Sequence, residues 1–131
     1  AGQAGGGLWE MDASEIVLGK RMAVGGYAEV YVASWRGTVV AVKQLLALNS
    51  LASIREFQKE VEFMANLRHP NLILFMGYTV RPVCTIVTEF MRRGSLHTVI
   101  TQHPGRPLPL KLQRSVAVAV ARGMQYLHSQ R

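Results

Sequence analysis

The stretch MAVGGYAEVYVASWRGTVVAVK, residues 22–43, decides the fold. It holds two glycine turns, at Gly25-Gly26 and at Gly37, and runs of β-branched and apolar residues lie on either side of each. Runs of this kind, bounded by glycine turns, are typical of neighbouring antiparallel strands. We therefore expect three consecutive strands, over residues 15–23, 28–35 and 38–45.

After residue 45 the apolar residues change from the spacing of a strand to that of a helix, and from residue 72 they again form runs of strand length. Ser53 is a candidate N-cap, and Glu56 would complete a capping box with it. Two apolar runs of strand length follow, then a short helix over 95–101 and a long one over 110–128. The expected class is α+β, with five strands and one helix after the third. The apolar face of that helix would carry Ile54, Phe57, Val61, Met64 and Leu67, and the later strands would span 72–78 and 83–90.

The long helix has only a narrow polar stripe, formed by Lys111, Arg114, Ser115, Arg122 and Gln125. Apolar residues cover most of the remaining surface, so such a helix should be buried on most of its perimeter. The 131 residues offer little to bury it. Together with the linker-like start AGQAGGG and the absence of an initial Met, this indicates a piece of a larger multidomain protein.

Charge and cysteine content exclude several classes of protein. The net charge is +7, but residues 1–89 hold eight Lys/Arg and all eight Asp/Glu, whereas residues 90–131 hold seven Lys/Arg and no acid. No aromatic-rich basic face appears, so we expect no nucleic-acid partner. No apolar run is long enough to span a membrane. The single Cys84 fits a buried strand residue in a reducing compartment.

Lys43 and Glu60 are the ionisable residues whose positions call for an explanation. Lys43 ends an apolar strand and shares a face with Ala41, and Glu60 falls inside the apolar arc of the helix. Together they suggest an ion pair, although each could instead lie at an edge with its charge in water. The Gly25-Gly26 turn could let a phosphate approach the backbone, or could be an ordinary hairpin. The four histidines show no metal-ligand spacing, so no metal site is expected.

Taken in order, these segments resemble a eukaryotic protein kinase domain. The hairpin, VAVK (40–43), the helix with Glu60, and RHPNLILFMGY (68–78) resemble its N-lobe. IVTEFMRRGSL (86–96) resembles the last N-lobe strand, the hinge and the following helix, and 112–131 resembles the long helix before the catalytic loop. LWEMDASEI (8–16) is most similar to the tyrosine-kinase-like group, which is mainly serine/threonine-specific. The resemblance implies a linker over 1–14, an N-lobe over 15–90 and the start of a C-lobe over 91–131.

The resemblance also implies residue roles. Lys43 would hold the α- and β-phosphates of ATP, and Glu60 would pair with it. Thr88 would be the gatekeeper at the back of the pocket, and Glu89 and Met91 would offer hinge backbone groups to adenine. Met64 and Phe75 would form the upper regulatory spine. The glycine-rich loop and adenine roof would comprise Met22, Ala23, Gly25, Gly26, Ala28, Val30 and Ala41.

Two departures from the family pattern matter. The loop motif G-x-G-x-x-G-x-V has alanine at positions 23 and 28. If Ala28 required φ > 0, strain of about 1 kcal/mol would weaken ATP binding, and reversal of both alanines to glycine would tighten it.

The second departure is that the chain stops before the catalytic loop, D-F-G and A-P-E segments. The chain alone is therefore expected to be inactive, with magnesium bound only in the complete domain. The complete protein would phosphorylate a protein substrate in the cytoplasm or on the cytosolic side of a membrane receptor. The alternative is a pseudokinase or a truncated scaffold that binds a nucleotide or a partner without catalysis.

Overall fold

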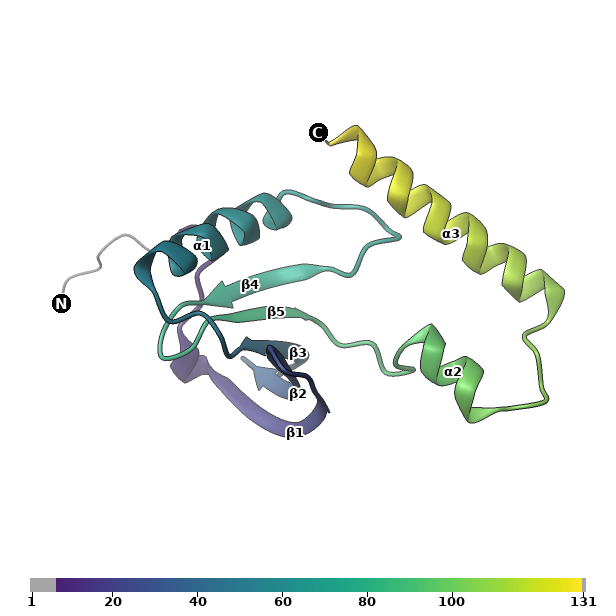
Figure 1. Cartoon of the computed structure of the whole chain (residues 1–131), viewed down its shortest axis with the longest axis horizontal. Coiled ribbons are helices and arrows are strands. Elements are labelled where there is room, and N and C mark those ends of the chain that lie inside the picture. Colours follow the sequence, from purple (N-terminus) through teal and green to yellow (C-terminus); the bar gives the residue numbers. More distant parts are fainter. Residues whose placement is uncertain (1–6, 131) are drawn as a thin grey trace. The chain divides into compact units, whose positions relative to one another are not determined.

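The computed structural model describes residues 7–130, which divide into two compact units (Figure 1). The first unit comprises the described residues up to Asn66 together with Leu74–Phe90. The second comprises Leu67–Ile73 and the described residues from Met91 onwards. Residues 67–73, which the sequence assigns to the N-lobe, thus join the second unit. Most of the expected linker AGQAGGG lies outside the described residues.

The framework of the first unit is a five-stranded antiparallel sheet in the order β1-β2-β3-β5-β4. The expected α+β class is confirmed, with a helix after the third strand. The first three strands match expectation to within a residue because glycine turns bound them. The fourth begins three residues late, since an apolar run alone does not distinguish strand from other buried chain. The strands are β1 (Ile16–Val24), β2 (Ala28–Trp35), β3 (Thr38–Leu45), β4 (Phe75–Thr79) and β5 (Thr85–Glu89).

The tight turn between β2 and β3 has two residues with positive φ, Arg36 at 47° and Gly37 at 79°. Such a turn matches the twist of the flanking strands, but a left-handed conformation is uncommon for a residue with a side chain. The Arg36 guanidinium is ion-paired with Glu15 and lies 4.9 Å from the centre of the Trp35 ring. These contacts offset part of the conformational cost at Arg36.

Helix α1 spans Leu51–Ala65, and its N-cap is Ser50. The expected N-cap at Ser53 with Glu56 is wrong. The Ser53 N–H donates to Ser50 Oγ at 3.1 Å, and the Ser50 N–H donates to Ser53 Oγ at 3.2 Å. A second serine thus takes the role that Glu or Gln has in the usual capping box. The helix starts one turn earlier than the pattern indicates, because the side chains of Ser50 and Ser53 each accept a hydrogen bond from the other residue's backbone N–H.

Helix α1 packs on one face of the sheet, here called the inner face; the opposite face is the outer face (Figure 1). Phe57 meets Tyr78 edge to face, with ring centroids 6.0 Å apart. Met64, expected on the buried side, is 36% exposed, and Leu67 lies beyond the end of the helix. The buried stripe therefore follows four-residue spacing. The inner cluster contains Phe57, Val61, Ala65, Phe75, Tyr78 and Cys84, and the outer cluster contains Ala33, Val40, Val42 and Val87.

The segment before β1 covers the β4 edge of the sheet. The Met11 N–H donates to the Tyr78 carbonyl at 2.7 Å, and the Tyr78 N–H donates to the Trp9 carbonyl at 3.1 Å. Trp9 also meets Phe75 edge to face at 6.2 Å. Residues 9–11 are thus packed against the domain and are not part of a free linker extending to residue 14. They pair backbone groups that an edge strand would otherwise expose.

The second unit contains α2 (Leu96–Gln102) and α3 (Leu110–Ser129). The Tyr126 hydroxyl accepts a hydrogen bond from the Arg68 N–H at 2.9 Å, and the Tyr126 ring stacks on His69 at 5.0 Å. Gly123 is the buried residue of α3 and lies against Asn71. Leu110 and Val120 remain 62% and 59% exposed, so residues 67–73 bury only part of the apolar perimeter. None of the helices in residues 7–130 is long and apolar enough to cross a membrane.

The reassigned cap predicts the effect of two substitutions. Ser50→Ala should lower the free energy of unfolding by about 1 kcal/mol, because it removes the acceptor for an N-terminal N–H group. Glu56→Gln should change that free energy by less than about 0.5 kcal/mol, because Glu56 is exposed and makes no capping contact. Urea unfolding followed by circular dichroism measures both. If Glu56→Gln lowered the free energy of unfolding more than Ser50→Ala, Ser53 would be the N-cap and not Ser50.

Gly77 should be intolerant of a side chain. An added Cβ would lie 2.9 Å from the Trp9 carbonyl oxygen and closer still to the Met11 side chain. We expect Gly77→Ala to destabilise the chain by about 1–3 kcal/mol, because residues 9–11 must move away from β4. Gly26→Ala is the matched control, since a Cβ there meets no atom within 4 Å and φ is not positive. Equal unfolding midpoints for the two variants would show that residues 9–11 do not pack against β4.

Candidate functional site

The pairing of β3 with its two neighbours collects four of the predicted site residues on the inner face. Lys43 lies opposite Val30 of β2, and Ala41 lies opposite Thr88 of β5. Directly opposed residues of antiparallel strands point to the same face, and so do residues two apart on one strand. Val30, Ala41, Lys43 and Thr88 therefore form one contiguous patch, with apolar residues beside a lysine.

The charged residues of β2, β3 and β5 lie on opposite faces of the sheet, with Lys43 on the inner face and the acidic residues on the outer face. Among the described residues of β2, β3 and β5, Lys43 is the single charged residue on the inner face. Glu29 lies on the outer face, where it accepts a hydrogen bond from the Tyr31 hydroxyl at 2.6 Å and is ion-paired with Arg21 at 3.6 Å. The hydrogen bond to Glu29 raises the pKa of Tyr31. The strands thus offer one positive charge, without a neighbouring carboxylate on those strands, to whatever approaches the inner face.

Lys43 and Glu60 do not form an ion pair in this structure. Both residues are exposed, and the ion pairs within residues 7–130 are Arg21–Glu29 and Arg36–Glu15. The expected pair is therefore absent here. The buried stripe of α1 runs through Phe57 and Val61, and Glu60 lies on its flank. An exposed pair gains only about 0–1 kcal/mol, so nothing compels the two side chains to meet while both are in water.

The turn between β1 and β2 leaves backbone donors available. The Gly25 N–H donates to the Ala28 carbonyl at 2.8 Å, and the Tyr27 carbonyl accepts from the Leu46 N–H at 3.0 Å. The N–H groups of Gly26 and Tyr27 make no hydrogen bond to another described residue. Successive unpaired N–H groups in a glycine turn are suited to binding an anion. A Cβ on Gly26 would meet nothing within 4 Å, so the turn is open on that side.

The two alanines of the loop are not strained. Ala23 pairs with Val30 in the β1–β2 ladder, and Ala28 begins β2 opposite Leu45. Arg36 is the single described residue other than glycine with positive φ. Ala28 does not have the positive φ that would strain it. The argument that strain at Ala28 weakens ATP binding is therefore wrong. Met22, near the start of the loop, is 54% exposed.

The end of β5 is held by a two-point contact with Leu74. The Glu89 N–H donates to the Leu74 carbonyl at 3.0 Å, and the Glu89 carboxylate accepts from the Leu74 N–H at 2.8 Å. The Thr88 hydroxyl donates to the Glu89 carbonyl at 3.2 Å. In the second unit, the Met91 carbonyl accepts from the Gly94 N–H at 3.0 Å, and the Met91 N–H has no partner among residues 7–130. The register itself does not place Met91 with the inner-face patch.

Two residues next to the predicted site were missed. Ile86 lies opposite Lys43 on β5 and packs against the inner cluster, so it borders the patch. Alternation from Thr88 along the strand could have indicated it. Leu74 holds Glu89 through its backbone, and no sequence signal marks a backbone contact of that kind.

The His, Cys, Asp and Glu side chains within residues 7–130 are the candidate ligands for a metal ion. No group of three or more His, Cys, Asp or Glu within residues 7–130 could hold a metal ion. Cys84 is 3% exposed, and burial raises the pKa of its thiol, which keeps it protonated at neutral pH.

Comparison with known proteins gives a family and a set of relatives. Residues 16–131 match the family model described as protein tyrosine and serine/threonine kinase. The chain is 46% identical over 124 residues to a probable serine/threonine-protein kinase, SIS8, of Arabidopsis thaliana, covering 93% of this chain and 12% of the relative. It is 44% identical over 123 residues to the probable serine/threonine-protein kinase drkD of Dictyostelium discoideum, covering 92% and 10%.

A third relative is the serine/threonine-protein kinase CTR1 of Arabidopsis thaliana, which is 38% identical over 118 residues, covering 88% of this chain and 14% of the relative. The chain therefore spans about a tenth of the length of these curated relatives. The family match extends from β1 through α3, across both units. The resemblance inferred from the motifs is confirmed, and the chain belongs to the protein tyrosine and serine/threonine kinase family.

Proposed function

We propose that this chain is the ATP-binding portion of a protein kinase domain that, in the complete protein, transfers the γ-phosphate of ATP to serine or threonine hydroxyls of a protein substrate. The observation that carries the proposal is the register of β3. It puts Val30, Ala41 and Lys43 on one face, beside a glycine turn with unpaired backbone N–H groups.

The residues present are suited to a nucleoside triphosphate. Val30 and Ala41 supply an apolar surface for a purine ring, and Lys43, two residues along the strand from Ala41, supplies a cation for phosphate oxygens. Gly25 and Gly26 would let the phosphates approach the backbone, because no side chain intervenes. Bound ATP supplies the phosphoryl group that is transferred; the residues of this chain bind and orient it.

Glu60 is proposed as a positioning residue for Lys43. In the present structure the two charges are solvated separately. Nucleotide bound over the patch would exclude water from Lys43, which strengthens its attraction both to the phosphates and to a carboxylate that reaches it. The pair forms if this gain exceeds the repulsion between Glu60 and the phosphates. Movement of α1 could bring Glu60 to Lys43 at that stage, and the pair would then fix the ammonium group against the phosphates.

We assign recognition of adenine to backbone groups at the end of β5 and just after it. The Glu89 carbonyl would accept from the exocyclic amine, and the Met91 N–H would donate to a ring nitrogen. The contact of Glu89 with Leu74 holds the end of β5 in place, which makes the Glu89 carbonyl a fixed acceptor. Thr88 would limit the depth of the pocket.

The 131 residues do not supply the acidic groups of phosphoryl transfer. Residues 90–131 contain no Asp or Glu, and residues 7–130 contain no cluster for a metal ion. We therefore propose that this chain alone binds ATP without transferring phosphate. Magnesium would be held by acidic residues of the complete domain. The same proposal puts the chain in the cytosol or on the cytosolic side of a receptor, as part of a larger multidomain protein.

A role as a pseudokinase or non-catalytic scaffold is the second candidate. The observation that favours it is the absence of the Lys43–Glu60 pair, together with the two alanines of the loop. A scaffold that binds no nucleotide predicts no saturable binding of Mg-ATP. Titration of the chain with Mg-ATP therefore separates the first candidate from a scaffold that binds only a partner. A pseudokinase that binds nucleotide is separated by an assay of phosphate transfer by the complete protein.

Lys43→Met should weaken binding of Mg-ATP at least about tenfold, because a charge-assisted hydrogen bond contributes roughly 1.5–3 kcal/mol. Lys59→Met is the matched control, since Lys59 is an exposed lysine of α1 outside the inner-face patch. Isothermal titration calorimetry gives the dissociation constants. Equal affinities for the two variants, or no binding by the unsubstituted chain, would contradict the proposed site.

The loop alanines and glycines should respond differently to substitution. Ala23→Gly combined with Ala28→Gly should change the dissociation constant for Mg-ATP by less than about threefold, because neither alanine has positive φ. Gly25→Ala should raise that constant at least about fivefold, because its Cβ would stand between the phosphates and the backbone. The same titration tests both. Tighter binding after the alanine reversal would show that the loop is strained after all.

A further inference from the structure

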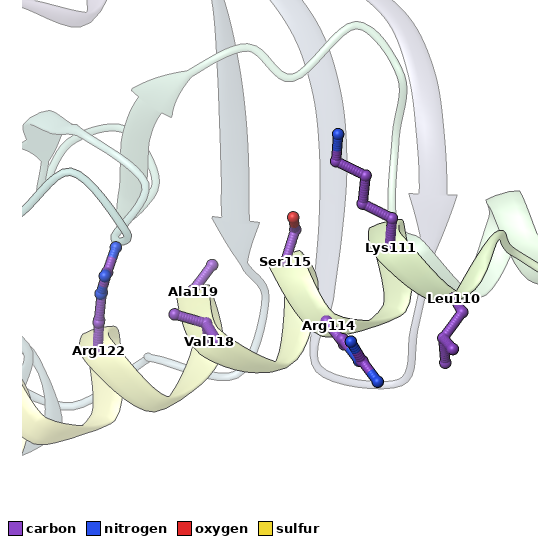
Figure 2. A pocket seen from close by; sticks show the side chains of 7 residues that line it. All are labelled: Leu110, Lys111, Arg114, Ser115, Val118, Ala119 and Arg122. Carbon is purple, nitrogen blue, oxygen red and sulfur yellow. The ribbon is translucent and has the colours of Figure 1, made fainter.

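One side of α3 presents cations around an open hollow of about 700 Å³ (Figure 2). Residues four apart on a helix lie in rows. One row contains Lys111, Ser115 and Ala119, and the neighbouring row contains Arg114, Val118 and Arg122. Figure 2 shows Lys111, Ser115 and Arg122 pointing to the same side of the helix. We call these six residues the basic groove.

The positive charge of the groove is not neutralised within its unit. Lys111, Arg114 and Arg122 are exposed, and no Asp or Glu occurs among the described residues of the second unit. The ion pairs in the described part of the chain, Arg21–Glu29 and Arg36–Glu15, both belong to the first unit. Lys111 and Arg114 are neighbours three residues apart on the helix and repel each other, which an anion bound beside them would relieve.

We propose that the basic groove binds an acidic, extended peptide segment of a partner protein. Lys111 and Arg122 are eleven residues apart, which corresponds to roughly 16 Å along the helix axis. An extended peptide covers that length in about five residues. Its side chains could place carboxylates at both ends of the groove and a third beside Arg114.

The lining suits such an occupant. Arginine forks bind carboxylates through two parallel hydrogen bonds. Ser115 can exchange a hydrogen bond with the peptide backbone, and Ala119 is small enough to let that backbone approach the helix. Exposed ion pairs contribute about 0.2–1 kcal/mol each, so the complex should be weak and sensitive to salt.

Two other polyanions fit the groove less well. Nucleic-acid single strands bind on aromatic platforms, and the seven residues that line the hollow include no aromatic ring. A membrane surface would contact the exposed apolar residues of α3, such as Val120 and Met124. At 100° per residue these lie across the helix from Lys111, so the basic groove would then point away from the lipid.

The test uses a fluorescein-labelled ten-residue peptide with alternating Glu, titrated with the 131-residue chain and followed by fluorescence anisotropy. Lys111→Gln, Arg114→Gln and Arg122→Gln combined should weaken binding at least about tenfold. The control combines Arg92→Gln, Arg93→Gln and Arg106→Gln, which removes the same charge from exposed positions of the same unit outside the groove. It should weaken binding less than about threefold. A peptide with Gln at every Glu position should not bind.

Several outcomes would overturn the proposal. Equal losses in the two triple variants would show that only net charge matters. Equal binding of the Glu and Gln peptides would exclude charge recognition. Tighter groove-dependent binding of a single-stranded oligonucleotide, or of vesicles containing phosphatidylserine, would assign the groove to that partner instead. If the variant with Gln at positions 111, 114 and 122 does not fold, NMR titration of the unsubstituted chain tests the proposal. The chemical-shift changes caused by the peptide should then be concentrated in residues 110–122, and changes spread over the rest of the chain would overturn it.

Discussion

The pairing of β3 with β2 and β5 is the constraint on which the rest of the first unit depends. A shift of one residue would turn every side chain of β3 to the other face. Val40 and Val42 would then leave the outer cluster, and Lys43 would be placed among apolar side chains. Burial of the valines on the outer face therefore fixes the register, and the register puts Lys43 opposite Val30 on the inner face, the side of the sheet that α1 covers. The proposed nucleotide site follows from packing of the opposite face.

Helix α1 is attached to the sheet through one narrow row of buried side chains, and the residues beside that row remain exposed. Phe57 and Val61 are buried against Tyr78, whereas Glu60 and Met64 stay accessible. The unpaired Lys43 and Glu60 are compatible with the proposed site, in which we propose that the two side chains pair when nucleotide binds.

The second unit differs from the first in the charge of its surface. Its described residues bury little of α3 and carry cations without carboxylates. In the kinase family the sheet and α1 correspond to the N-lobe, and α2 and α3 to the start of the C-lobe. The chain spans about a tenth of the length of the curated relatives it matches. The first unit, in contrast, contains the Asp and Glu residues of the chain.

The sequence by itself determined the first three strands, the α+β fold class and the family. Glycine turns and β-branched runs are local signals, and the family follows from the order in which the motifs with Lys43 and Glu60 occur along the chain. The sequence did not determine the cap at Ser50, the packing of Trp9 against β4, or the assignment of residues 67–73 to the second unit. These depend on contacts between distant segments. The same holds for Lys43 and Glu60, since a helical wheel gives a direction around α1 but not the distance from α1 to the sheet.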